Sequence, residues 1–142
     1  MTLLKKIVMD WQGNYRLVAK NEKGITVKFD APISFGGEES ALSPMENVLA
    51  SIAACSSIHI ISLLNEQEQK ISGYSVEIQA ERKEEPPRTF TKIHIQYIIK
   101  GANINEAIVK KAISDTENNY WSVGTMLKKA VPISTSFKII ES

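Results

Sequence analysis

The segment from Ser43 to Leu64 constrains the fold more than any other part of the chain, because it predicts a long buried helix. Ser43 can cap the first turn, Pro44 suits the first helical position, and Glu46 completes a Ser-x-x-Glu capping box. Apolar side chains then occupy almost every face: Val48, Leu49, Ile52, Ile58, Ile60, Ile61, Leu63 and Leu64. A helix that is apolar on all sides is typical of a protein core, so we predict the central helix of the fold here.

The middle of this segment carries small side chains around the only cysteine of the chain, Cys55. The small residues between Ala50 and Ser57 allow a second helix to approach closely at this point. Serines interrupt the apolar run, and the run is short for a membrane span. We therefore expect the core helix of a soluble protein.

Composition sets the class of protein. A length of 142 residues suits one domain, over residues 1–142, and apolar and charged fractions of 43% and 23% are typical of a globular chain. A formal charge of +1 gives no reason to expect nucleic-acid or membrane binding. One cysteine cannot form an internal disulfide, and the N-terminal charges do not fit a signal peptide, so a cytoplasmic protein is expected. Two histidines and one cysteine without clustering predict no metal site, and no cofactor is expected.

Alternating apolar and polar residues predict strands over residues 3–10, 15–19, 25–29, 74–81, 90–100 and 131–139. The first three strands suit a meander and the next two a long hairpin. Two helices are expected after the hairpin, over residues 105–118 and 120–129. The order β-β-β-α-β-β-α-α-β predicts an α+β fold with an antiparallel sheet packed on helices.

The loop from Asp30 to Leu42 is about a dozen residues long, which is long for a connection in a compact domain. It contains a proline, two consecutive glycines and two consecutive acids, and it leads the chain to Ser43. Two interpretations stay open for it, one wall of a pocket above the helix or an ordinary surface crossover.

Cys55 is the first candidate for chemistry, although a lone cysteine in a buried helix is usually a small hydrophobic residue. A reactive thiolate would need a nearby cation, and arginine suits that role best inside a protein. Glu46 is explained by the capping box, and it could also orient such an arginine. His59 lies four residues after Cys55 on the same helical face, so a Cys-His pair and a structural histidine are both open.

Three stretches, taken together, resemble the OsmC/Ohr family, and most closely its YhfA-like branch of OsmC-related proteins. They are Ser43–Cys55, Arg82–His94 and Tyr120–Pro132, and the loop with Asp30-Ala-Pro and Gly36-Gly37-Glu38 fits as well. The resemblance therefore covers nearly the whole chain. Each motif is moderately specific alone, and the three are specific in this order and spacing.

The resemblance implies an OsmC-like fold in an intertwined homodimer. The central helices of the two subunits would be buried together, each sheet would include strands of both chains, and two sites would lie at the interface. It also implies thiol-dependent reduction of hydroperoxides, preferably organic ones. In the family's cycle a peroxidatic cysteine of the central helix becomes a sulfenic acid, then a disulfide with a second cysteine, which a dithiol reductant restores. Cys55 matches the peroxidatic position.

The second cysteine of the family pattern is missing from this chain. The family pattern Tyr-Cys-Ser-Val corresponds to residues 120–123, where Trp121 stands at the resolving position. Because the chain has one cysteine, the two-cysteine cycle is impossible within it. Tyr120 and Trp121 would otherwise be interpreted as core or interface anchors.

The residues that would assist the cysteine also differ. The organic-hydroperoxide-resistance branch has its active-site glutamate ten residues before the cysteine, and that position is Met45 here. Glu46, one position later, matches the YhfA-like branch. Two positions are open for the arginine, Arg16 in the N-terminal strands and Arg88 in the matched Pro-Arg-Thr-Phe stretch.

Two functions remain open. In the first, Cys55 attacks a hydroperoxide as a thiolate, one of the two arginines stabilises it, Glu46 orients that arginine, and an external thiol regenerates the cysteine. In the second, a catalytically impaired dimer binds a small apolar ligand in the interface pocket, for which Trp121, Tyr120 and Met45 are the candidate lining residues. Fast alkylation of the thiol favours the first function, and slow alkylation favours the second.

Overall fold

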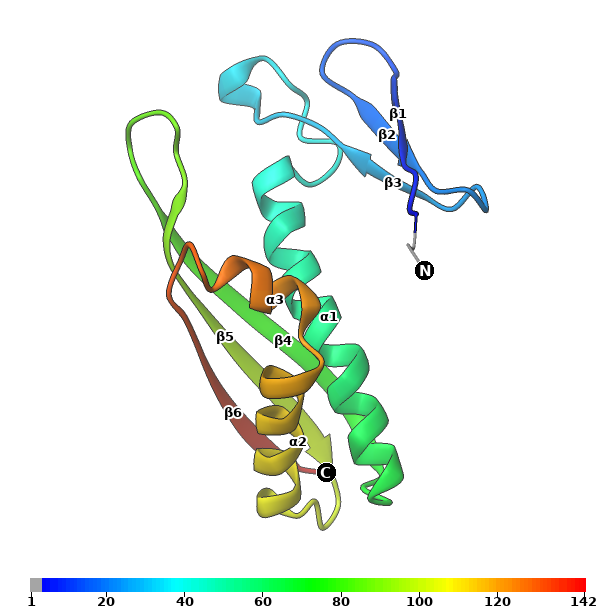
Figure 1. Cartoon of the computed structure of the whole chain (residues 1–142), viewed down its shortest axis with the longest axis vertical. Helices are drawn as coiled ribbons and strands as arrows, with labels where there is room; N and C mark the ends of the chain where they lie inside the picture. The colour runs from blue at the N-terminus through cyan, green and yellow to red at the C-terminus, as the bar shows by residue number, and fades with distance from the viewer. Residues whose placement is uncertain (1–3) are drawn as a thin grey trace. The chain divides into compact units, whose positions relative to one another are not determined.

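The computed structural model of the protein describes residues 4–142 (Figure 1). Strands and helices follow one another in the predicted order, and a short 3₁₀ helix is added before the long helix. The chain forms two compact units, an N-terminal unit that ends at Val48 and a C-terminal unit that begins at Leu49. A single domain over residues 1–142 stays a prediction.

The N-terminal unit contains a three-stranded antiparallel meander. Its strands, in the order β1-β2-β3, are β1 (Val8–Trp11), β2 (Leu17–Lys20) and β3 (Thr26–Phe29). The meander is confirmed, with shorter strands than predicted. The first strand starts at Val8 because its partner, Lys20, is the last residue of β2 before the next turn, and residue 3 lies outside the described residues. Only Ala19 of these strands is buried, so most of the meander's apolar side chains lie open.

The connection from β3 to the long helix is ordered by a 3₁₀ helix, η1 (Ile33–Phe35). Gly36 ends it with a φ of 108°, a left-handed conformation that suits glycine. Gly37 approaches the Ala31 backbone so closely that an added Cβ would overlap the Ala31 carbonyl. The two glycines of this loop are therefore required by its backbone path.

The long helix α1 (Pro44–Glu66) begins at the predicted capping box. The Ser43 amide donates to Glu46 Oε1 over 2.9 Å, and the Glu46 amide donates to Ser43 Oγ over 3.3 Å. Each side chain thus satisfies a backbone group that the first turn would leave without a partner.

Within one chain, α1 is buried along one stripe only. The buried residues are Ile52, Ala53, Ser56, Ile60 and Leu64. The opposite stripe, Ala50, Ala54, Ile58 and Ser62, is exposed, and Ile58 is 68% accessible. The prediction of burial on all sides is therefore wrong for the single chain, because the sheet of the C-terminal unit covers only one face of the helix. By length and composition alone, α1 could also cross a membrane, a test that core helices of soluble proteins pass as well.

The sheet of the C-terminal unit has the order β4-β5-β6. Its strands are β4 (Ile71–Arg82), β5 (Phe90–Gly101) and β6 (Ile133–Glu141). β4 and β5 form the predicted long antiparallel hairpin. β6 pairs with β5 in parallel, so the prediction of a purely antiparallel sheet is wrong in this pair. The reason is the connection: two helices carry the chain back to the starting end of the sheet, as a parallel crossover requires.

Those two helices are α2 (Glu106–Asn119) and α3 (Ser122–Leu127). Asn105 caps α2, since its side chain accepts a hydrogen bond from the Ile108 amide over 3.2 Å. α1 and α2 pack on the same face of the sheet (Figure 1). The core between them is built on the inward side chains of β5, which are Ile93, Ile95, Tyr97 and Ile99. The predicted α+β class is confirmed, and it consists of two three-stranded sheets with helices.

Candidate functional site

Cys55 lies in the middle of α1 at the edge of its buried stripe, and it is half-buried. Two tyrosines from the sheet bond to the serines that follow it. The Tyr97 hydroxyl donates to Ser56 Oγ over 2.7 Å, and the Tyr74 hydroxyl donates to Ser57 Oγ over 2.8 Å. These bonds fix α1 against β4 and β5 beside the thiol.

Both tyrosines are neutral donors. Burial raises the pKa of Tyr74 to about 12, although its bond to Ser57 acts in the opposite direction. Burial also raises the pKa of Tyr97 far above its ordinary value, and its bond to Ser56 again opposes the shift. Because the phenols keep their protons at neutral pH, they hold the helix but cannot serve as bases for the thiol.

Trp121, at the position of the missing second cysteine, is a buried part of the core. Its side chain is 4% accessible, and the indole N–H donates to the Ile52 carbonyl over 2.9 Å. Ile52 lies about one helical turn before Cys55. The indole also packs on Gly124, where any Cβ would overlap the ring. Trp121 is therefore fixed against the helix that carries the cysteine.

Tyr120 is stacked on His59. The ring centroids lie 5.1 Å apart with an interplanar angle of 18°, and Tyr120 is 48% accessible. The stack fixes the imidazole plane at the position four residues after Cys55, so the structural role of His59 is supported by a defined contact. Tyr120 and Trp121 thus both contact the helix that carries Cys55. Trp121 contacts it at Ile52, before the cysteine, and Tyr120 contacts it at His59, after the cysteine.

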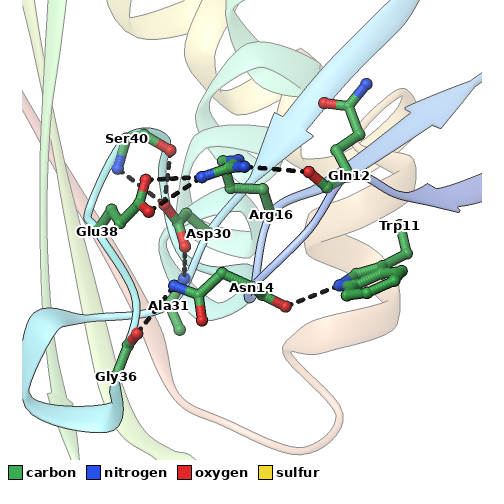
Figure 2. A network of polar contacts seen from close by, with 9 residues as sticks. All are labelled: Trp11, Gln12, Asn14, Arg16, Asp30, Ala31, Gly36, Glu38 and Ser40. Atoms are coloured by element: carbon green, nitrogen blue, oxygen red, sulfur yellow. Dashed lines mark hydrogen bonds and ion pairs between the residues drawn. The ribbon is translucent and has the colours of Figure 1, made fainter.

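Arg16 lies in the N-terminal unit, at the end of the turn between β1 and β2 (Figure 2). Its Nη1 lies 2.8 Å from Glu38 Oε2 and 3.0 Å from Glu38 Oε1. Its Nη2 donates to the Gln12 carbonyl over 3.1 Å. The guanidinium is consequently held between the turn and the loop that follows η1.

Glu46 and Met45 occupy the first turn of α1. The Glu46 carboxylate accepts the Ser43 amide, and this hydrogen bond holds the pKa of Glu46 below its usual value. Met45 is half-buried. The Glu46 carboxylate thus bonds to the capping residue Ser43, while the carboxylate that contacts Arg16 belongs to Glu38.

Arg88 lies in the connection between β4 and β5. Its Nε donates to the Lys83 carbonyl over 3.4 Å, and its own carbonyl accepts the Arg82 Nε over 2.9 Å. The residue is exposed. Both hydrogen bonds join Arg88 to residues at the start of the connection. Arg88 is therefore less firmly fixed than Arg16, which an acidic side chain holds by charge-assisted bonds.

Asp30 anchors the loop that carries Glu38. Its side chain is buried, and it accepts the Ala31 amide over 2.7 Å, the Ser40 amide over 3.0 Å and the Ser40 hydroxyl. The bond from the Ser40 side chain is the main reason that the pKa of Asp30 falls to about 2. The carboxylate therefore ties together the two ends of the loop.

We expect the loop to loosen in acid through Asp30. The native pKa of about 2 lies below the ordinary value of 3.8, so the carboxylate stabilises the folded loop fully above about pH 4 and loses this effect as the pH falls through about 2. Amide exchange at Ser40, followed between pH 5 and pH 2, measures the change. Asp30→Asn should remove this dependence, whereas Glu22→Gln, an exposed change in the same unit, should keep it. An unchanged acid profile in Asp30→Asn would contradict the assignment.

The sequence left two interpretations of this loop open, a pocket wall and a surface crossover, and did not assign roles to its acidic residues. The adjacent pair Glu38 and Glu39 and the two glycines were visible as a pattern. Only the structure shows that Glu38 contacts Arg16, while Glu39 accepts the Ile33 amide over 2.9 Å. The adjacent residues Glu38 and Glu39 therefore make different contacts.

A hollow of about 740 Å³ lies elsewhere, at one end of the C-terminal sheet. Its polar lining includes His94, whose ring nitrogens lie 2.7 Å from Ser134 Oγ and 3.0 Å from Ser136 Oγ. Its lining includes none of the candidate catalytic residues. Residues 4–142 also contain no group of three or more His, Cys, Asp or Glu side chains arranged to hold a metal ion.

Known proteins with the same sequence pattern identify the family. The family model described as OsmC-like protein matches residues 36–136. Protein YhfA of Escherichia coli (strain K12) is 37% identical over 102 residues, which cover 72% of this chain and 76% of YhfA.

Solved structures share the fold over nearly the full chain. A hypothetical protein from Aquifex aeolicus VF5 has a TM-score of 0.85 and 22% identity, over 99% of both chains. An organic hydroperoxide resistance protein OsmC from Legionella pneumophila has a TM-score of 0.69 and 16% identity, over 96% of this chain and 99% of the other. At these identities the likeness concerns the fold. Together with the family match and the identity to YhfA, it confirms the resemblance noted in the sequence: this chain belongs to the OsmC family.

Proposed function

We propose that the protein reduces organic hydroperoxides with a single peroxidatic cysteine, Cys55. The observation that carries this proposal is the position of Cys55: it is the one thiol of an OsmC-family chain, half-accessible, in the middle of α1. A structural relative is described as an organic hydroperoxide resistance protein, which supports the same substrate class here. The reaction needs no cofactor.

The proposed chemistry starts with the Cys55 thiolate. The sulfur attacks the distal oxygen of the hydroperoxide, an S–O bond forms, the O–O bond breaks, and the alkoxide leaves and takes up a proton as the alcohol. The sulfur is oxidised by two electrons to a sulfenic acid. An external thiol then displaces water to form a mixed disulfide, and a second thiol releases the Cys55 thiolate with the oxidised disulfide product.

The neighbouring residues have distinct proposed roles. Arg16 stabilises the thiolate, and we prefer it to Arg88 because its guanidinium is already fixed by an ion pair. Glu46 stands at the start of the same helix as Cys55 and is proposed to orient the arginine, since its bond with the Ser43 amide uses only the carboxylate oxygen Oε1. Tyr120, Trp121 and Met45 are proposed to line the substrate pocket.

Trp121 determines how the oxidised Cys55 can be reduced again. A buried indole at the resolving position cannot form a disulfide, so recycling depends on thiols from outside the chain. We place this cycle in the cytoplasm, where thiols are kept reduced. Glutathione-like or dithiol reductants are the chemical class that the step needs.

The functional form is proposed to be a homodimer. The exposed stripe of α1 and the open meander are apolar surfaces that a second copy can cover, and monomeric proteins rarely leave large apolar patches in water. Burial of both surfaces in a dimer would remove from water the apolar side chains that a single chain leaves exposed. Neither nucleic acid nor membrane is a proposed partner.

The decisive experiment measures oxidation of Cys55 by intact-protein mass. The protein is exposed for seconds to cumene hydroperoxide, hydrogen peroxide or buffer in the presence of a sulfenic-acid trap. We expect trapping within seconds, faster with the organic peroxide, because the residues proposed to line the pocket are aromatic and apolar. Addition of a small thiol should return the unmodified mass.

Cys55→Ser is the control, and it should show no trapped product. If wild-type Cys55 stays unmodified for many minutes, the peroxidase proposal fails. Slow alkylation together with binding of apolar fluorescent probes would then favour the catalytically impaired ligand-binding dimer.

A further inference from the structure

The sheet of the C-terminal unit carries a group of polar side chains on the face opposite α1 and α2 (Figure 1). Ile93 and Ile95 of β5 are buried in the core beneath the helices, so His94, which lies between them, points to the opposite face. The hollow of about 740 Å³ lies at this end of the sheet, and residues of all three strands line it. A hollow of this volume has room for a small organic molecule.

The register of the sheet arranges the polar lining of the hollow in two rows. Gln79, His94 and Ser134 are direct neighbours on β4, β5 and β6. In the adjacent row Glu81 pairs with Lys92, and their side chains form an ion pair at 3.5 Å. Lys92 lies two residues before His94 on the same strand, so both side chains are on one face. The hollow therefore brings together a hydroxyl, an imidazole and a cation.

Serine hydroxyls of β6 engage both ring nitrogens of His94. Nδ1 lies 2.7 Å from Ser134 Oγ, and Nε2 lies 3.0 Å from Ser136 Oγ. A neutral imidazole has one N–H donor and one acceptor nitrogen, so one serine donates its proton to the ring and the other accepts the proton of the ring. The two bonds also fix the plane of the imidazole along β6.

Accessibility distinguishes the two serines. Ser134 is exposed and lines the hollow, whereas Ser136 is half-buried and does not line it. A molecule in the hollow therefore meets the Ser134 hydroxyl. A hydroxyl within hydrogen-bond reach of a base, with a third group orienting that base, is the arrangement that activates a nucleophile. In this order the groups are Ser134, His94 and Ser136.

Stability of the sheet does not require this arrangement. The bond between Ser134 and His94 is exposed, and water competes there for both partners, so its net contribution to folding is small. One cross-strand bond would pair β5 with β6 at this position equally well. The second bond, from Ser136, adds a defined orientation of the imidazole toward the hydroxyl in the hollow.

We propose that Ser134 is a nucleophile for acyl transfer, with His94 as its general base and Ser136 as the positioning residue of the imidazole. The substrates are small carboxylic esters, which bind in the hollow. Pro132, exposed beside Ser134, offers apolar surface to the acyl group. All these residues belong to the C-terminal unit. The site is separate from Cys55 and from the proposed reduction of hydroperoxides.

Lys92 supplies the positive charge for the oxyanion. Its ion pair with Glu81 is exposed on both sides, at 68% and 66%, and such a pair holds a lysine weakly. The ammonium can therefore turn toward a negative oxygen that forms at Ser134, in the next row of the same face. A cation near a developing oxyanion lowers the barrier of acyl transfer.

The proposed reaction passes through an acyl-enzyme. Ser134 Oγ attacks the carbonyl carbon, His94 Nδ1 takes the hydroxyl proton, and the carbonyl oxygen takes the electron pair of the C=O bond. The intermediate then collapses, the bond to the leaving alcohol breaks, and the imidazolium returns the proton to that alcohol. Water attacks the acyl group in the same way and releases the carboxylic acid with free Ser134. Nothing is oxidised or reduced, and water is the only co-reactant.

Labelling with diisopropyl fluorophosphate identifies the nucleophile. The experiment uses the full chain with Cys55→Ser, because this change removes the thiol as a competing group. We expect the mass of one diisopropylphosphoryl group per chain, and fragmentation of the labelled peptide should place it on Ser134. An unlabelled chain, or a label on a different residue, would overturn the proposal.

Hydrolysis of p-nitrophenyl acetate, in the same Cys55→Ser background, tests the roles of the side chains. Ser134→Ala and His94→Gln should each slow the release of p-nitrophenol by about a hundredfold. Lys92→Gln should slow it by about tenfold, since its charge acts at an exposed site. Ser75→Ala removes an exposed hydroxyl from the same face of β4 and should leave the rate unchanged. If Ser134→Ala reacts as fast as its parent, the serine is not the nucleophile.

The positioning role of Ser136 is tested by rescue. Ser136→Ala should slow hydrolysis by about tenfold through kcat, with KM nearly unchanged, because the residue does not touch the ester. Ser136→Thr restores the hydroxyl on a residue that suits a strand, and it should recover most of the rate. A threonine variant that folds normally by circular dichroism but stays as slow as Ser136→Ala would refute this role.

Discussion

Replacing Trp121 with alanine is expected to lower the free energy of unfolding by about 3–5 kcal/mol, the range found for large aromatic side chains removed from a core. The side chain is 4% accessible, and its removal leaves a cavity against Gly124, which has no side chain to fill it. The Ile52 carbonyl also loses the indole N–H that it accepts over 2.9 Å. The cavity would open about one helical turn from Cys55.

Urea unfolding followed by circular dichroism at one fixed protein concentration measures this loss, since the stability of an oligomer depends on concentration. Tyr120→Ala is the matched control, because the neighbouring aromatic is 48% accessible and its removal should cost less. Trp121→Phe keeps much of the volume but lacks the N–H, and should fall between the two. A loss below about 1 kcal/mol for Trp121→Ala, within the range of ordinary surface changes, would show that the indole is not a core element.

Introducing aspartate at Ile58 is expected to abolish the proposed homodimer. Ile58 is 68% accessible in the single chain and belongs to the exposed stripe of α1. If two such stripes pack together, the new carboxylate would be buried without a partner, which costs several kcal/mol. The wild type should have the mass of two chains in light scattering, and Ile58→Asp should have the mass of one or aggregate.

Ile58→Val provides the control, because it keeps an apolar side chain of similar shape and should leave the dimer intact. A wild-type chain that is monomeric at micromolar concentration would remove the basis of the dimer proposal. A dimer that survives Ile58→Asp would show instead that the stripe faces solvent, and the partner surface would then have to lie on the open meander.

Much of the local structure follows from short-range patterns. Ser43 and Glu46 fixed the start of α1 because a capping box needs only four residues and satisfies its own backbone groups. The β4–β5 hairpin followed from two short-range features: alternation predicted the strands, and the short connection between them predicted antiparallel pairing. Family membership also followed from the sequence, because three motifs occurred in the right order and spacing.

Other features depended on contacts between residues far apart in the chain. The parallel pairing of β6 could not be predicted from its own alternation, which is the same in either direction; the crossover through α2 and α3 decides it. The sequence also could not predict which stripe of α1 is buried, because both faces carry small or apolar residues. Only the position of the sheet distinguishes the two faces.

In the candidate site, too, the sequence identified some of the residues and only the structure identified their contacts. From the sequence, Cys55 could be named as the candidate nucleophile and Trp121 as the substitute for the second cysteine, because both are matters of position within a motif. The partner of Arg16 could not be named, since Glu38 lies 22 residues away and Glu39 and Glu46 also carry carboxylates. Backbone geometry made the choice: Gly37, Asp30 and the Asn14 bond bring one carboxylate, and not its neighbours, within reach of the guanidinium. Residue types and local spacing thus determine which groups are available, and the tertiary path of the backbone determines which of them meet.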